Sequence, residues 1–229
     1  MKKILLSILT IVAVVFMTSC EKETEDIATG SVYYPVFVNS GSQLNVVGLG
    51  ESFTVPEVTV YEGDKDITDQ ATITGEVDLS TPGYYSVTYE ATTSDGYTGS
   101  YEVIVFVYHP DYKEAPIAGD YNGSLSTIGG GPVTIKEFQK GVYTIDDAFA
   151  GFYNVYNGYG SVYMAPGYLI YVGNNNFILR NCTSPWGAVL DDGGVSYDPA
   201  TGIIMYGAYF PADGYNWSGL PFILTPVVE

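Results

Sequence analysis

Two tryptophans and several tyrosines stand in stretches rich in glycine and asparagine, where burial in a strand is hard to arrange. Trp186 lies in the run Ser-Pro-Trp-Gly and Trp217 in the run Tyr-Asn-Trp-Ser-Gly, and both runs are typical of loops. Loop aromatics beside amides and carboxylates suit sugars, because ring faces stack on sugar rings while polar groups bond the hydroxyls. The alternative is that these rings close the ends of a β domain. The predicted ligand-binding residues are Trp186, Trp217, Tyr153, Tyr156, Tyr159, Asn216 and Asp213.

Catalytic chemistry finds little support in the sequence. The chain has one histidine, His109, which nearly excludes histidine-based acid–base or metal chemistry. A glycosidase needs two carboxylates about 5 to 10 Å apart. The aspartate pairs at 146–147 and 191–192 lie in glycine-rich turns, so we expect them to face solvent. The acids at 64, 66 and 69 lack the closing glutamate of a calcium loop. We therefore predict no enzyme activity, no metal site and no cofactor.

The first 20 residues have the parts of a secretory signal. Lys2 and Lys3 precede an apolar run over residues 4–16, and the small residue Ser19 precedes Cys20. The run is shorter than the roughly 20 apolar residues that span a membrane. The pattern resembles a bacterial lipoprotein signal, which implies a signal peptide over residues 1–19 and lipidation of Cys20. An uncleaved membrane anchor is the alternative.

A polar, acidic stretch follows, and residues 20–31 are predicted to form a solvated tether. It resembles the surface-export signal of lipoproteins in Bacteroidetes-type bacteria, which implies a lipid anchor in the outer membrane and exposure at the cell surface. A plain linker is the alternative. The net charge of −18 argues against a nucleic-acid partner, because binding to phosphates needs clustered Lys and Arg. With Cys20 lipidated, Cys182 has no disulfide partner, and its strand-like context predicts a buried, inert thiol.

The composition, with 22 tyrosines, 27 glycines and no long helical periodicity, predicts an all-β protein with many tight turns. Residues 84–91 alternate apolar and polar side chains, as a half-buried strand does. About seven short strands over residues 32–109 predict a β-sandwich. Residues 81–91, together with Gly50-Glu51 and the run at 66–68, resemble bacterial surface immunoglobulin-like domains. That resemblance implies an Ig-like β-sandwich that serves as a spacer or stalk.

A proline-bounded linker over residues 110–116 is predicted to separate this sandwich from a second domain over residues 117–229. Eight to ten short strands there predict an antiparallel, barrel-like or curled-sheet domain. Within it, residues 161–164 are predicted as a strand and residues 146–151 as one helical turn capped by Asp146. Residues 141–147, 151–153 and 197–202 resemble the C-terminal domains of Bacteroidetes surface lipoproteins of unassigned function.

These resemblances, with the loop aromatics, predict a non-catalytic outer-membrane surface lipoprotein. Its expected role is accessory glycan binding beside a starch-utilisation-like nutrient import system. The expected partners are the lipid anchor in the membrane, a polysaccharide or oligosaccharide, and import-system proteins. The alternatives are a structural or partner-docking envelope lipoprotein without a ligand and, less favoured, a glycoside hydrolase.

Overall fold

Strands make up most of the regular structure of this protein. The computed structural model describes residues 31–217 and 219–228, and the predicted signal peptide, Cys20 and nearly all of the tether lie outside them. No helix in the described residues has the length and apolar character to cross a membrane. The all-β fold predicted from the sequence is confirmed. The short helices are η1 (Thr68–Gln70), η2 (Pro110–Glu114), η3 (Phe152–Tyr156) and η4 (Ser161–Tyr163).

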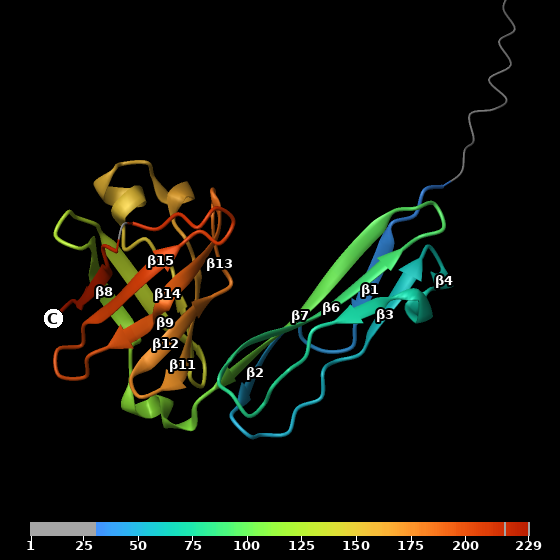
Figure 1. Ribbon diagram of the computed structural model, residues 1–229, viewed down its shortest axis with the longest axis horizontal. Coiled ribbons are helices and arrows are strands. Elements are labelled where there is room, and N and C mark those ends of the chain that lie inside the picture. Colours follow the sequence, from blue (N-terminus) through green and yellow to red (C-terminus); the bar gives the residue numbers. More distant parts are fainter. Residues whose placement is uncertain (1–30, 218, 229) are drawn as a thin grey trace, which may run out of the picture. The chain divides into compact units, whose positions relative to one another are not determined.

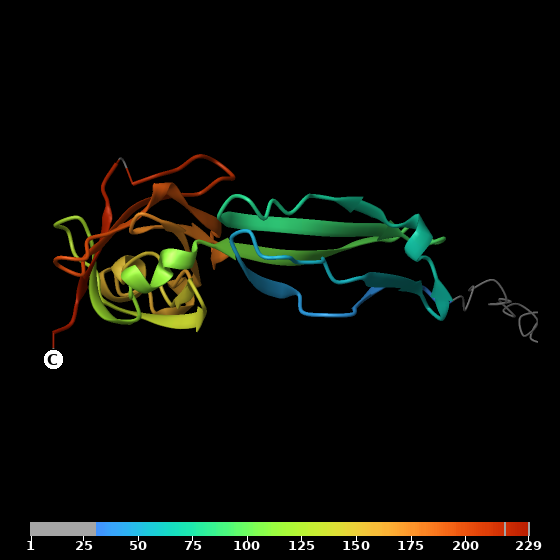
Figure 2. The ribbon, with the colours of Figure 1, turned by 90° about the horizontal axis from the view of Figure 1, so that it is seen from below.

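Residues 35–108 form the predicted Ig-like β-sandwich. Its strands are β1 (Pro35–Asn39), β2 (Leu44–Gly48), β3 (Val58–Glu62), β4 (Lys65–Asp66), β5 (Thr72–Thr74), β6 (Gly83–Thr92) and β7 (Thr98–Tyr108). One sheet has the order β1-β3-β4 and the other has the order β2-β7-β6-β5. Figure 2 shows β6 and β7 side by side, and they pair from Gly83↔Val107 to Thr92↔Thr98. This long hairpin is the backbone of the sandwich.

Alternating apolar side chains join the two sheets of the sandwich. Val87 and Tyr89 on β6 are buried, whereas the residues between and after them are more exposed. Val58 on β3 packs in one cluster with Val87, Tyr89 and Val103. Because side chains alternate across a strand, one face of β6 lies in the core, as the sequence alternation predicts.

Residues 119–226 form a second β structure, whose strands wrap into a barrel (Figure 1). Its strands are β8 (Gly119–Leu125), β9 (Pro132–Gln139), β10 (Val142–Ile145), β11 (Gly167–Gly173), β12 (Asn176–Arg180), β13 (Cys182–Ser184), β14 (Gly187–Tyr197), β15 (Ile204–Tyr209) and β16 (Phe222–Pro226). The order is β12-β11-β10-β9-β8-β16-β15-β14, and β12 also pairs with β14. The sequence left open a barrel or a curled sheet, and this pairing makes it a closed barrel.

The barrel interior is filled by side chains. Phe149, Tyr171, Phe177 and Phe222 are among its largest fully buried residues. An eight-stranded barrel is just wide enough for side chains to fill, so the lumen is a packed core and no channel. The predicted boundary at residues 110–116 stays a prediction. In the structure this segment includes η2.

The carboxylate of Asp191 holds the seam where the barrel closes. The β12–β14 pairing covers only Asn176↔Ser196 and Phe177↔Val195, and the register of β14 shifts between Asp192 and Val195. Beyond this bulge, Asp191 accepts hydrogen bonds from the backbone N–H groups of Leu179 and Gly194, each at 2.8 Å. It also forms an ion pair with Arg180.

The prediction that the 191–192 pair faces solvent is therefore wrong for Asp191, which is 8% exposed. The physical reason is that the bulge leaves backbone donors without strand partners, and buried donors need an acceptor. Asp192, its neighbour, is exposed as predicted.

Two local predictions in the barrel are wrong. Residues 146–151 form turns instead of a helical turn, and residues 161–164 contain η4 instead of a strand. Gly151, Gly158 and Gly160 have φ values of 73°, 71° and 90°. This left-handed backbone suits glycine and interrupts both a regular helix and a strand ladder. The segment is therefore a folded loop between β10 and β11.

Candidate functional site

Three segments meet at one end of the barrel and carry the predicted ligand-binding residues. They are the loop over residues 148–165 with η3 and η4, the turn between β13 and β14, and the described residues 210–217 and 219–221 between β15 and β16. Figure 1 shows the first of these, in gold, covering the barrel end. Ring contacts join all three segments: Tyr153 lies 4.7 Å from Trp186 and 6.5 Å from Trp217 between ring centroids. The structure thus brings residues together that are up to 64 positions apart.

The first segment is fixed to the barrel by Asp147. Its carboxylate accepts hydrogen bonds from the N–H groups of Phe149 at 2.9 Å, Gly151 at 3.1 Å and Ala165 at 3.1 Å. The start and the end of the loop are therefore bound to the same side chain. Burial raises the pKa of Asp147, while the three backbone donors favour the ionised form and oppose that rise.

The prediction that the 146–147 pair faces solvent is wrong for Asp147, which is fully buried. The reason is that the N–H groups of the loop find their acceptor in this carboxylate instead of in a strand. Asp146 is half-buried and accepts a hydrogen bond from the N–H of Thr134 at 2.9 Å. Neither aspartate pair thus presents two free carboxylates to one site.

Trp186 lies at the tip of the β13–β14 hairpin, and 46% of it is exposed. The Ser184 hydroxyl accepts from the Trp186 N–H at 3.2 Å and donates to the Gly187 carbonyl at 3.0 Å, which fixes the turn. The rings of Tyr153 and Tyr163 lie 4.7 and 5.1 Å from the Trp186 ring. Trp186 is therefore an exposed indole supported by two neighbouring rings.

Trp217, unlike Trp186, is buried. It is 6% exposed and packs 5.0 Å from Phe222 and 5.5 Å from Phe149. Its indole N–H donates a hydrogen bond to the Tyr153 hydroxyl at 3.2 Å. A ring buried in this way cannot present a face to a sugar. Trp217 therefore belongs to the core at this end of the barrel, below the exposed rings.

The other predicted tyrosines complete an exposed set of rings. Tyr156 is 53% exposed and stacks on Phe152 at 5.6 Å, and Tyr159 is 52% exposed and stacks on Tyr153 at 6.1 Å. Tyr163, which the predicted set omitted, lies 5.4 Å from Tyr159. It could have been found, because it belongs to the same glycine-rich stretch. We call the set Tyr153, Tyr156, Tyr159, Tyr163 and Trp186 the aromatic face.

The predicted polar residues lie on the third segment. Asp213 is exposed, and its carboxylate accepts from the Tyr215 N–H at 2.8 Å, which closes a tight turn. Asn216 is exposed and forms a β-bridge with Tyr209. Tyr215, 51% exposed, was not predicted, and its ring lies 5.5 Å from Trp217. The structure thus places Asp213 and Asn216 on the loop that carries Trp217.

The Cys182 thiol at this end of the barrel is poorly suited to act as a nucleophile. Cys182 is buried, as predicted, and its thiol donates to the Ala165 carbonyl at 3.2 Å. Burial raises the pKa of the Cys182 thiol to about 12, so the thiolate is disfavoured. Across the residues that the structure describes, no three His, Cys, Asp or Glu side chains are grouped to hold a metal ion. What the site offers is exposed, supported ring surface.

Two family models match this chain. Residues 39–105 match the Ig-like domain of bacterial surface proteins. Residues 74–219 match a family model described as a "-like, C-terminal domain". This second match spans more than half of the chain, and the protein therefore belongs to that C-terminal-domain family. No curated protein matches the chain.

Solved structures give more distant similarities. The lipoprotein BT2262 from Bacteroides thetaiotaomicron is 23% identical with a TM-score of 0.38, over 83% of this chain and 98% of that chain. The CBM51-2 and INT domains of Clostridium perfringens ZmpB, in complex with GlcNAc, are 17% identical with a TM-score of 0.26, over 76% of this chain. The M60 catalytic domain of ZmpB with its CBM51-1 and CBM51-2 domains is 14% identical with a TM-score of 0.27, over 84% of this chain. The alignments span 29% and 21% of the two clostridial chains.

Proposed function

We propose that this protein is a non-catalytic surface lipoprotein that holds a glycan on the aromatic face. The observation that carries the proposal is the exposed Trp186 ring, supported by Tyr153 and Tyr163 and continued by the half-exposed Tyr159. Sugar rings need flat apolar partners, and rings held by their neighbours lose little freedom when a ligand stacks on them.

The cellular location in this proposal is the outer surface of the outer membrane. It is supported by the Met-Thr-Ser-Cys run that ends at Cys20 and by the match to an Ig-like domain of bacterial surface proteins. In this arrangement the Ig-like sandwich acts as a stalk. Replacing Cys20 with Ala is expected to release the protein from the membrane fraction or to block its maturation. Unchanged retention and processing would contradict lipidation.

In this proposal the protein binds glycan at the cell surface next to a nutrient import system. Two or three stacking rings give only weak binding, on the order of micromolar to millimolar. Many anchored copies on one cell raise the effective affinity for a polymer. This role predicts neighbouring genes for a nutrient-import porin and its lid lipoprotein.

Binding to a panel of polysaccharides tests the proposal. We would compare the wild-type protein with Trp186→Ala by affinity electrophoresis in starch, xylan, mannan and galactan gels. Tyr34→Ala is the matched control, because Tyr34 is also an exposed aromatic, at 62%, but it directly precedes β1 of the sandwich. Retardation that is lost in Trp186→Ala and kept in Tyr34→Ala supports the proposal. Equal retardation of all three proteins would place the site elsewhere.

A partner-docking role is the second candidate. Val162, 72% exposed, and Val155, 47% exposed, lie on the same loop as the aromatic face, and exposed apolar patches also mark protein contacts. If this protein serves to dock a partner, it should bind none of the glycans in the panel. It should instead bind a partner protein through the same loop. Glycoside hydrolysis has less support, since Asp147 and Asp191 are buried and already bonded.

A further inference from the structure

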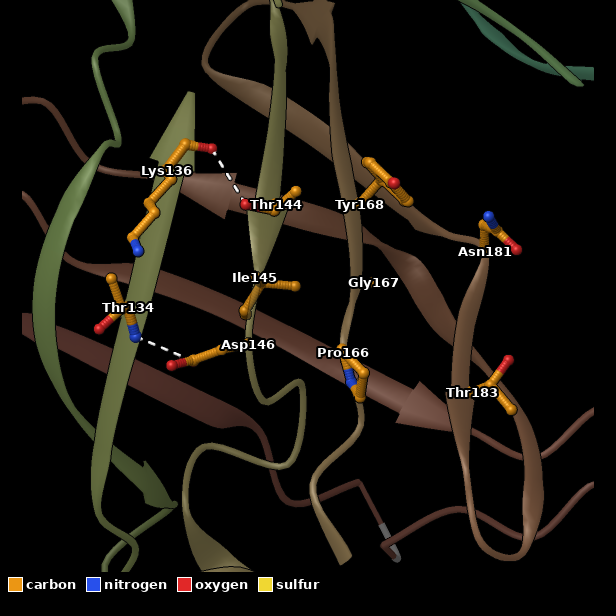
Figure 3. A pocket seen from close by; sticks show the side chains of 10 residues that line it. All are labelled: Thr134, Lys136, Thr144, Ile145, Asp146, Pro166, Gly167, Tyr168, Asn181 and Thr183. Carbon is orange, nitrogen blue, oxygen red and sulfur yellow. Dashed lines mark hydrogen bonds between the residues drawn. The ribbon is translucent and has the colours of Figure 1, made fainter. Parts of the chain in front are cut away.

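A groove of about 540 Å³ runs along the outer wall of the barrel, and it contains none of the aromatic-face residues. Its residues come from β9, from β10 and β11 with the residues next to them, from the corner at Asn181 and from β13 (Figure 3). We call it the wall groove and define it by Lys136, Thr144, Asp146, Tyr168, Asn181 and Thr183. Its volume lies within the range of about 300 to 1,000 Å³ that is usual for small-molecule sites.

Polar groups with free hydrogen-bonding capacity converge on the wall groove. Among the residues that the structure describes, the side chains of Lys136, Tyr168, Asn181 and Thr183 have no hydrogen bond or ion pair. Asp146 uses one carboxylate oxygen, toward Thr134, which leaves the other oxygen for a ligand. The groove thus offers an ammonium, a carboxylate oxygen, an amide and hydroxyls around one tyrosine ring, and such a mixture of donors and acceptors matches sugar hydroxyls.

The charge of the groove favours a neutral ligand. Lys136 and Asp146 bring one charge of each sign. The whole chain carries a net charge of −18, so a polyanionic glycan would be repelled over its length.

The corner residue Asn181 is held in an unusual backbone conformation. Its φ is 48°, in the left-handed region that non-glycine residues seldom adopt. Asparagine adopts this region more readily than most residues. The sharp change of chain direction between β12 and β13 accounts for the conformation. Figure 3 shows the Asn181 side chain at the edge of the group of residues that line the groove.

The wall groove and the aromatic face are joined by short stretches of chain. Asp146 in the groove directly precedes Asp147, which anchors the loop that carries four of the five rings. Thr183 in the groove is three residues before Trp186. At a strand rise of about 3.3 Å per residue, the separation along this stretch is at most about 10 Å. One short glycan chain can therefore reach both surfaces.

We propose that the wall groove is a second subsite for the same glycan. The barrel then binds a neutral oligosaccharide chain that runs from the Trp186 ring onto the barrel wall. This inference rests on the proposed glycan-binding function and adds the class of ligand: a neutral chain of several sugars instead of a single residue. Two linked contacts on one ligand raise its affinity well above that of either contact alone.

Chain length and two groove substitutions test this inference. Isothermal titration would use oligosaccharides of one to six units from starch, xylan, mannan and galactan. The groove variant is Asn181→Gly with Thr183→Val. Glycine suits the backbone at position 181, and valine keeps the shape of threonine in a strand. The matched control is Thr225→Val, an exposed position on β16 outside the groove.

The expected result is at least about tenfold tighter binding of the longest oligosaccharide than of the monosaccharide. The groove variant is expected to lose about tenfold in affinity for the long chain, while Thr225→Val and binding of the monosaccharide stay unchanged. Binding that depends on Trp186 but on neither chain length nor the groove would overturn this inference and leave the proposed function standing. If no oligosaccharide binds, both are wrong.

Discussion

Replacing Asp191 with Asn tests how the barrel is closed. The carboxylate accepts two backbone N–H groups at 2.8 Å and pairs with Arg180, which is 29% exposed. The asparagine side chain keeps one acceptor oxygen. Its NH₂ group takes the place of the other oxygen and faces a backbone N–H that then has no acceptor. Hydrogen bonds to a charged group contribute about 1.5 to 3 kcal/mol, and a buried donor without an acceptor costs about 1 to 3 kcal/mol. Rehydration of Arg180 offsets part of this loss.

We therefore expect Asp191→Asn to lower the free energy of unfolding by about 3 kcal/mol. For a chain of this size that corresponds to a fall in Tm of about 6 to 12 °C. The assay is thermal unfolding followed by circular dichroism, with hydrogen exchange at the amides of Leu179 and Gly194. Asp192→Asn is the matched control, because this neighbour is exposed, and its effect should stay within about 0.5 kcal/mol. Equal stability of the two variants would refute the role assigned to the Asp191 carboxylate.

Three further predictions concern the barrel end. Cys182, with a pKa of about 12, should resist alkylation until the protein unfolds. Because this pKa lies above the ordinary value of 9.0, the unfolded chain loses the thiol proton first as the pH rises. The free energy of unfolding should therefore fall between pH 9 and pH 12. Rapid alkylation in buffer would contradict this. Trp217→Ala should cost about 3 to 5 kcal/mol in a denaturant titration, and a loss below about 1 kcal/mol would mean that the indole is not core. Gly151→Ala should destabilise more than Gly158→Ala: both have positive φ, but a Cβ at 151 would lie 2.3 Å from the Gly131 nitrogen, and position 158 is open. Equal melting temperatures would contradict the close approach.

Strands and turns were largely predictable because they depend on local pattern. The alternation along β6 and the turn at Gly141, whose φ is 68°, need only neighbouring residues to specify them. The hairpin of β9 and β10, whose strands pair up to Ile145↔Ile135, is local in the same way. Residues 161–164 were predicted as a strand, but they contain the short helix η4, which follows the left-handed Gly160.

The burial of Asp147 and Asp191 could not be predicted from the sequence. Each carboxylate is buried because distant backbone N–H groups lack partners, and Ala165 and Leu179 reach them only in the folded barrel. The two tryptophans pose the same problem. Both stand in loops with similar neighbours, yet the loop of Trp217 folds over Phe149 and Phe222 while Trp186 caps a hairpin. Which of two similar rings is exposed is decided by tertiary packing.

Fluorescence quenching of the two tryptophans tests the central claim that the aromatic face binds a glycan. Trp186 is 46% exposed and Trp217 is 6% exposed, so acrylamide should quench Trp186 first. The account predicts that neutral oligosaccharides of the panel shield the quenchable fraction in the wild-type protein. In Trp186→Phe, that fraction and its shielding should both be absent. Quenching that no oligosaccharide changes, at concentrations up to the millimolar range expected for weak binding, would contradict the claim.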